Sequence, residues 1–216
     1  MQALAAWVGF PLAFAVLVVG WGFLVELASG RLLAGALVPG AGFAALVVAL
    51  ALPGFAQSTA PAAIWLAIAG ALLGWVLHGL GRGPRPGLPR AGGWALATAA
   101  GAFLLYLAPT LFSGDPAVGG FIRLDDSATW TALGDFVLRH GYDLSGLPAS
   151  SHNSALASYL PGHYPVGAFL PLAATSRLVG TDIAWCYASY LACVAALLAL
   201  ALRELEIGRA SCRERV

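Results

Sequence analysis

Long apolar stretches without charge constrain the fold of this chain more than any other feature. Five of them cover residues 3–25, 32–52, 62–80, 93–112 and 183–202, and none contains Asp, Glu, Lys or Arg. A helix of about 20 apolar residues crosses the roughly 30 Å hydrocarbon core of a bilayer. The chain is 60% hydrophobic and only 10% charged, which excludes an ordinary soluble domain. The sequence therefore predicts an all-α, polytopic transmembrane helix bundle whose first partner is the lipid bilayer.

A sixth apolar segment is harder to assign. Residues 164–176 carry no charge, but so short a stretch is marginal for crossing a bilayer. Extending it to Gly180 requires Arg177 to snorkel toward the cytoplasmic interface. We therefore expect about six spans, and a re-entrant helix over 164–180 is the alternative.

The loop between the third and fourth spans orients the chain. It is rich in Pro and Gly and carries Arg82, Arg85 and Arg90, which marks the cytoplasmic side by the positive-inside rule. The fourth span then leads outward, and the polar segment after it is extracytoplasmic. The basic residues are all Arg, which indicates a GC-rich, bacterial coding sequence. We expect a protein of the bacterial cytoplasmic membrane with no nucleic-acid partner, since its net charge is only +1.

The polar segment, residues 113–163, is the longest loop of the chain and the place where chemistry is expected. Loops of this length are usually functional or disordered, and its aromatic and aliphatic content predicts order. Asp126 or Ser127 can cap a helix that runs to about His140 and stops at Gly141. Its apolar stripe predicts an amphipathic helix on the outer surface, facing lipid or the bundle.

Adjacent carboxylates at Asp125 and Asp126 open this helix, and three uses stay open. An ionised Asp can act as a general base toward an attacking hydroxyl. The pair can hold a divalent cation through hard oxygen ligands. Alternatively, one caps the helix and both are solvated.

Three sequence runs in and after this loop resemble the first external loop of GT-C glycosyltransferases. They are LDDSATW at 124–130, the following ALGDFVLRHG, and SYLPGHYPVGAFLPL at 158–172. GT-C enzymes are polytopic and use polyprenyl-phosphate sugars. The resemblance implies transfer of a sugar to a cell-envelope glycan, lipid or protein acceptor, with a loop Asp as general base. That role falls to Asp125 or Asp126, and we favour Asp126 slightly.

The resemblance also implies a site for the donor's phosphate. A lipid-anchored donor needs no nucleotide-binding domain, and the sequence has no Gly-rich phosphate fingerprint. Arg123 is the nearest cation to the acids, and the other predicted substrate-binding residues are Trp130, Arg139, His140, His163 and Tyr164. No residue is assigned as a metal ligand.

The chain divides into three parts on this interpretation. Residues 1–92 hold three spans that precede the GT-C-like start, residues 93–205 carry the resemblance, and residues 206–216 look like translated sequencing adapter. We expect the chain to be a fragment of an enzyme and inactive by itself. A transporter or a membrane scaffold is the alternative, although spans without ionisable residues disfavour transport.

Overall fold

The computed structural model describes residues 2–30, 33, 35–81, 92–113, 125–145, 147–162 and 164–213, without the side chains of residues 125, 126 and 207–213. Across these ranges the chain forms helices and no strand. Five helical segments are long and apolar enough to cross a membrane: Gln2–Ala28, Val38–Phe55, Ala60–Leu80, Gly93–Ser113 and Ile183–Glu206. The predicted all-α polytopic bundle is confirmed.

The elements follow one another along the chain as short and long helices. They are α1 (Gln2–Leu4), the π-helical turn η1 (Ala5–Gly9), α2 (Phe10–Ala28), α3 (Val38–Ala51), the 3₁₀ turns η2 (Leu52–Phe55) and η3 (Ala60–Ala62), α4 (Ala63–Leu80), α5 (Gly93–Ser113), α7 (Asp125–His140), α8 (Ser151–Tyr159), the 3₁₀ turn η4 (Gly167–Phe169), α9 (Leu170–Leu178) and α10 (Ile183–Arg213).

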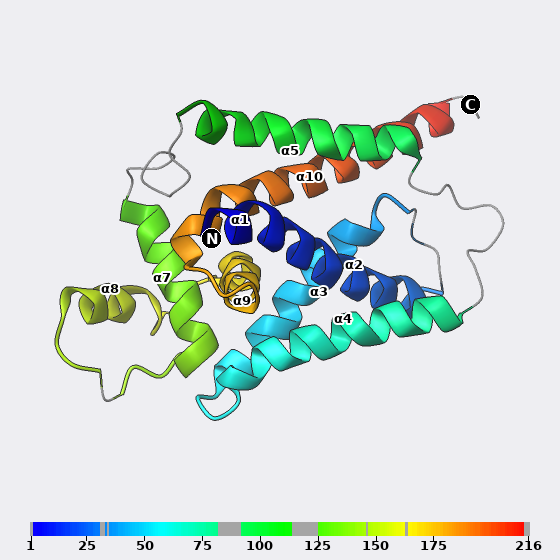
Figure 1. Ribbon diagram of the computed structural model, residues 1–216. Helices are drawn as coiled ribbons and strands as arrows, with labels where there is room; N and C mark the ends of the chain where they lie inside the picture. The colour runs from blue at the N-terminus through cyan, green and yellow to red at the C-terminus, as the bar shows by residue number, and fades with distance from the viewer. Residues whose placement is uncertain are drawn as a thin grey trace.

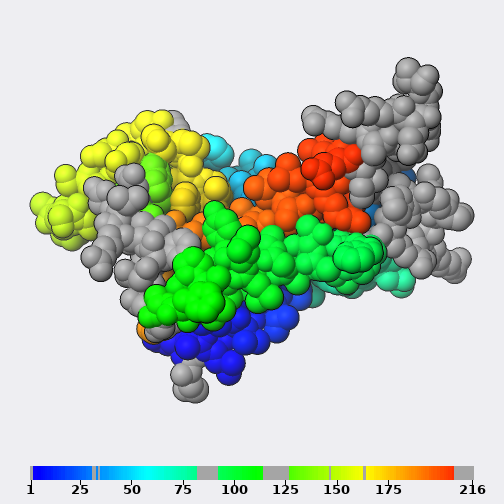
Figure 2. Space-filling model, turned by 90° about the horizontal axis from the view of Figure 1, so that it is seen from above, coloured from blue at the N-terminus to red at the C-terminus, as the bar shows by residue number. Residues whose placement is uncertain are grey.

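Helix α2 is the centre of one half of the bundle, packed against α3 and α4, and α5 pairs with α10 in the other half (Figure 1). The space-filling view shows α5 and α10 side by side along the molecule, with α8 gathered at one end (Figure 2). Helices α7, α8 and α9 lie at the end where the chain starts. The opposite end holds the end of α4, the start of α5 and the end of α10 (Figure 1).

Glycines bring α2, α3 and α4 into backbone contact. A Cβ atom on Gly42 of α3 would lie 1.8 Å from the carbonyl oxygen of Val18 on α2. A Cβ on Gly74 of α4 would lie equally close, 1.8 Å, to the carbonyl oxygen of Gly20. Close approach through small residues is the usual basis of helix packing in membranes, where lipid is as apolar as a leucine side chain. Only glycine fits at these two positions.

Two prolines lie where the backbone hydrogen bonding of the first two spans changes: Pro11 after a π-helical turn and Pro39 at the start of α3. Pro11 follows the π-helical turn η1, in which the N–H of Phe10 donates to the carbonyl of Ala5, five residues earlier. Pro39 occupies the first turn of α3, where its missing N–H costs nothing. The second span therefore begins at Val38, and the predicted start at residue 32 is wrong.

The segment 164–180 does not form a spanning helix. Helix α9 has nine residues and is therefore about 14 Å long, at 1.5 Å per residue. Its residues Leu170–Ser176 are all buried in the bundle. The guanidinium of Arg177 binds Asp135 of α7. Of the two alternatives, the spanning one, which required Arg177 to snorkel, is therefore not the one that the structure adopts. Helix α10 then runs to the end of the bundle that holds the end of α4 and the start of α5, whereas a sixth span would end at the opposite end.

Candidate functional site at one end of the bundle

Helix α7 ends where the sequence predicts, but it starts earlier than predicted, so Asp126 and Ser127 lie within its first turn and do not cap it. It begins at Asp125 and ends at His140, and Gly141 follows with φ of +65°, a conformation that glycine adopts without strain. The N–H of Gly141 donates to the carbonyl of Val137 at 2.9 Å, which closes the last turn. The two predicted carboxylates thus lie in the first turn of an ordered helix, although their side chains are outside the described part.

The apolar face of α7 packs on the bundle and not on lipid. Leu133, Val137 and Leu138 are at most 1% exposed. Gly134 lets α7 approach the turn before α9, since a Cβ there would lie 3.1 Å from the Cβ of Phe169. The helix is therefore a docked part of the fold, whose first turn is held at this end of the molecule.

An ion-pair cluster centred on Asp135 joins α7 to α9. Arg177 donates from Nε at 3.0 Å and from Nη2 at 2.7 Å to Oδ1 of Asp135, and also to its backbone carbonyl at 3.1 Å. Arg139 donates to the other carboxylate oxygen, Oδ2, at 2.6 Å. Two guanidiniums share one carboxylate, so the cluster carries one positive charge in excess.

A cavity of about 380 Å³ opens beside this cluster. Its polar lining comes from Thr131, Asp135, Arg139 and His140 of α7 and from His152 of α8. Both imidazoles are exposed, so they meet solvent at the mouth of the cavity. The Thr131 hydroxyl already donates to the backbone carbonyls of Ser127 and Ala128, so the unbalanced positive charge and the two imidazoles are what suit a polar ligand that carries negative charge.

An aromatic cluster lies around Trp130, one helical turn after Asp126 along α7. The ring of Trp130 stacks on Tyr164 with centroids 4.6 Å apart and lies 5.3 Å from the ring of Tyr159. Phe169 also stacks on Trp130, with the ring centroids 6.2 Å apart. Tyr164 is 45% exposed, so the cluster presents an aromatic face to its surroundings.

The predicted substrate-binding residues divide into two groups. Trp130 and Tyr164 meet in the aromatic cluster, whereas Arg139 and His140 line the polar cavity. Arg123 and His163 lie outside the described residues, as do the side chains of the two predicted catalytic residues. In the part of the chain that is described, no group of three His, Cys, Asp or Glu residues is placed to hold a metal ion.

Sequence analysis missed four residues that build this end of the molecule: Asp135, Arg177, His152 and Tyr159. Asp135 and Arg139 could have been paired from their spacing, because residues four apart are neighbours on a helix. Arg177 lies 42 residues from Asp135, and no local pattern indicates that pair. His152 and Tyr159 belong to α8, a short helix in a stretch rich in Ser and Ala.

Two titratable groups near the end of α7 have shifted pKa values. Hydrogen bonds from Ser145 lower the pKa of Asp143, whose Oδ1 accepts from the Ser145 N–H at 2.8 Å. Burial raises the pKa of the Tyr142 hydroxyl. Asp143 therefore stays ionised at neutral pH and closes a local turn, while Tyr142 stays protonated.

Comparisons with known proteins leave the family open. No protein-family model matches the chain, and no curated protein or solved structure matches it.

Proposed function

We propose that this chain forms the catalytic end of a membrane glycosyltransferase, in which an Asp in the first turn of α7 is the general base. The enzyme moves a sugar from a polyprenyl-phosphate donor to an acceptor hydroxyl on the extracytoplasmic face. One observation carries the proposal: the aromatic cluster of Trp130, Tyr159 and Tyr164 lies one helical turn from Asp126 in a docked helix.

The aromatic cluster supplies a surface for a sugar ring. The C–H bonds on one face of a pyranose form a flat apolar patch that packs against an aromatic ring. Trp130 is half-buried and held by three neighbouring rings, so its position is fixed before a ligand arrives. A preformed platform lowers the entropy that a bound sugar loses.

The first turn of α7 suits a base that must stay ionised. The positive end of the helix dipole stabilises a carboxylate there, typically by 0.3 to 1 kcal/mol. In the proposed step, Asp126 or Asp125 takes the proton of the acceptor hydroxyl as its oxygen bonds to the sugar's anomeric carbon. The bond from that carbon to the phosphate oxygen breaks, and polyprenyl phosphate leaves as the anion without needing a proton.

The polar cavity beside Asp135 supplies a second place for a negatively charged group. Its shared carboxylate leaves one guanidinium charge unbalanced, and Arg139 is the more exposed of the two Arg partners, at 56% against 25% for Arg177. Arg139 follows Trp130 by nine residues, which places it about 14 Å further along α7 and on the opposite face, so the cavity is distinct from the sugar surface. We therefore assign Trp130 to the sugar, and Arg139 to a negatively charged group of the substrate that is not bonded directly to that sugar.

The test is sugar transfer in membranes that express the complete reading frame, with Asp125→Asn, Asp126→Asn and the double variant. Asn keeps the size of Asp but cannot take the proton. General-base catalysis contributes roughly 10²- to 10⁴-fold, so one single variant should lose at least about 100-fold in rate. Asp143→Asn, at an Asp of the same loop whose carboxylate accepts from the Ser145 N–H, is the matched control and should keep full rate. Full activity in the double variant would contradict the proposal.

Donor binding can be tested separately on the 216-residue chain. A polyprenyl-phosphate sugar with a photoreactive group on the sugar should label the Trp130 and Tyr164 region, and Trp130→Ala should remove most of that label. Trp94→Ala, at a Trp that is 80% exposed at the opposite end of the bundle, should not change it. If Trp130→Ala leaves the label unchanged, the aromatic cluster does not bind the sugar.

A further inference from the structure

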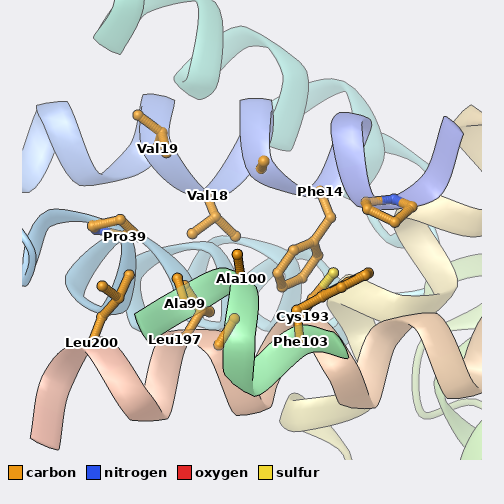
Figure 3. A pocket seen from close by; sticks show the side chains of 13 residues that line it. Phe14, Val18, Val19, Pro39, Ala99, Ala100, Phe103, Cys193, Leu197 and Leu200 are labelled. Atoms are coloured by element: carbon orange, nitrogen blue, oxygen red, sulfur yellow. The ribbon is translucent and has the colours of Figure 1, made fainter. Parts of the chain in front are cut away.

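An apolar cavity of about 290 Å³ lies between the two halves of the bundle, remote from α7. Its walls come from α2, α3, α5 and α10, and Figure 3 shows Phe14, Val18, Phe103 and Leu197 pointing into it. The sulfur of Cys193 is the one side-chain atom other than carbon in the lining. Nothing in this lining can hydrogen-bond strongly or balance a charge, so the cavity suits hydrocarbon.

The position of the cavity along the spanning helices shows which part of the bilayer surrounds it. Phe14–Val18 lie near the middle of the span Gln2–Ala28, and Ala99–Phe103 near the middle of Gly93–Ser113. Residues 193–197 hold the same place in Ile183–Glu206. The middle of a spanning helix lies in the hydrocarbon core, which is about 30 Å thick, so neither water nor a lipid headgroup reaches it. Lipid chains are the material available at this depth.

The cavity is open to those chains. Ala15 on α2 and Ala100 on α5 line it and are nevertheless exposed, so its mouth lies between these two helices. Its volume is about twice that of an engineered apolar cavity of roughly 150 Å³ that stays dry and binds benzene. Left empty, it would deprive its lining of dispersion contacts on one side.

We propose that the groove between α2 and α5 binds one acyl chain of a bilayer phospholipid, which completes the packing between the α5–α10 pair and α2. Lipid chains are as apolar as the lining, so the gain comes from dispersion contacts and not from the hydrophobic effect. Binding is therefore an enrichment over bulk lipid and not a permanent attachment. It is independent of the proposed sugar transfer, since the groove shares no residue with the site on α7.

The experiment uses the whole chain in phosphatidylcholine vesicles, with a small fraction of lipid that carries a diazirine midway along one acyl chain. After irradiation, mass spectrometry maps the adducts. We expect several-fold more adduct on Phe103, in the groove, than on Leu105, which is 76% exposed on the outer face of α5. Equal labelling of the two would overturn the proposal.

A second experiment fills the groove with a larger side chain. Ala100→Trp should reduce the groove adducts several-fold, whereas Ala97→Trp, at an exposed position on the same helix outside the groove, should leave them unchanged. Ala15→Trp fills the groove from the opposite wall and replaces Ala100→Trp if that variant does not fold. If Ala100→Trp or Ala15→Trp folds and the groove residues are still labelled as in the unaltered chain, the proposal is overturned. Selective loss of the adducts on adding a few mole per cent of polyprenyl phosphate would overturn the phospholipid assignment in favour of a prenyl chain.

Discussion

The middle of the bundle and the end that carries α7 are held together by different physical means. Between α2, α3 and α4, backbone touches backbone at Gly20, Gly22, Gly42 and Gly74. Around α7, side chains from distant segments meet, as Arg177 does with Asp135. The first region depends on the absence of side-chain atoms, and the second on charge and ring geometry.

This difference predicts which positions tolerate amino-acid substitution. The glycine contacts leave no space even for a methyl group, so the packing there is fixed. The end with α7 is open to solvent at a polar cavity and an aromatic face, so its contacts can be altered one at a time. The middle is thus a closely packed scaffold, and the end with α7 is the part whose contacts can be changed separately.

The largest expected effect is at Gly42. Gly42→Leu places side-chain atoms where a Cβ already lies 1.8 Å from the Val18 carbonyl oxygen, so α2 and α3 must separate. We expect a loss of more than about 4 kcal/mol, the range of mutations that destroy a fold. Thermal unfolding in detergent with size-exclusion monitoring measures it.

Gly40 provides the control on the same helix. A Cβ at Gly40 has no atom within 4 Å, and alanine is favoured over glycine in a helix by about 1 kcal/mol. Gly40→Ala should therefore be neutral or slightly stabilising. Equal unfolding temperatures for Gly40→Ala and Gly42→Leu would show that the glycine contacts do not hold the middle together.

The next effect is at the ion-pair cluster. Asp135→Asn leaves the guanidinium of Arg177 without its carboxylate, and losing one partner of a buried pair costs 3 to 5 kcal/mol. Both side chains are about a quarter exposed, so we expect a smaller loss of about 1 to 3 kcal/mol. Hydrogen exchange should show that amides of α7 and α9 lose protection while those of α2 to α4 keep it.

Arg139→Gln serves as the matched variant because it removes the more exposed partner of the same carboxylate. Its side chain is 56% exposed, and surface pairs contribute at most about 1 kcal/mol. A loss in Arg139→Gln as large as that in Asp135→Asn would contradict the view that Arg177 is what anchors α7.

A smaller effect is expected for the stacked pair Trp130 and Tyr164. A double-mutant cycle with Trp130→Ala and Tyr164→Ala should give a coupling of about 0.5 to 1.5 kcal/mol, the usual value for aromatic pairs. Chemical denaturation of the four proteins measures it. Additive effects would mean that the two rings do not support each other.

The smallest effect is at Asp143. Because its folded pKa is lowered by Ser145, the carboxylate stabilises the fold above its unfolded pKa of about 3.9. That contribution disappears as pH falls through the lowered pKa. Asp143→Asn should therefore reduce stability slightly at neutral pH and make the acid limb of the stability curve less steep. Unchanged curves would show that the turn at Ser145 has no energetic role.

Much of this architecture follows from local sequence. Spans were predictable because uncharged stretches of about 20 residues have one stable form in lipid. The end of α7 was predictable because Gly141 adopts the left-handed conformation that closes a helix.

The site was less predictable because its parts are distant in sequence. The segment before Arg177 has the hydropathy of a short span, and only the pairing with Asp135 shows that its end lies beside α7. Likewise, Trp130 and Tyr164 are separated by all of α8, and no periodicity predicts that their rings stack. Local pattern determined the helices, whereas tertiary packing determined which polar side chains meet.

The most direct test of this account is the side of the membrane on which α10 ends. In a chain with Cys186, Cys193 and Cys212 replaced by Ala, single cysteines at Ser151, Gly92 and Glu206 would be exposed to a membrane-impermeant maleimide on intact cells. Five spans with α7 and α8 outside predict labelling at residue 151 alone, and labelling at 92 and 206 only after permeabilisation. Labelling of residue 206 in intact cells, together with 151, would show that α9 crosses the membrane and would contradict the account.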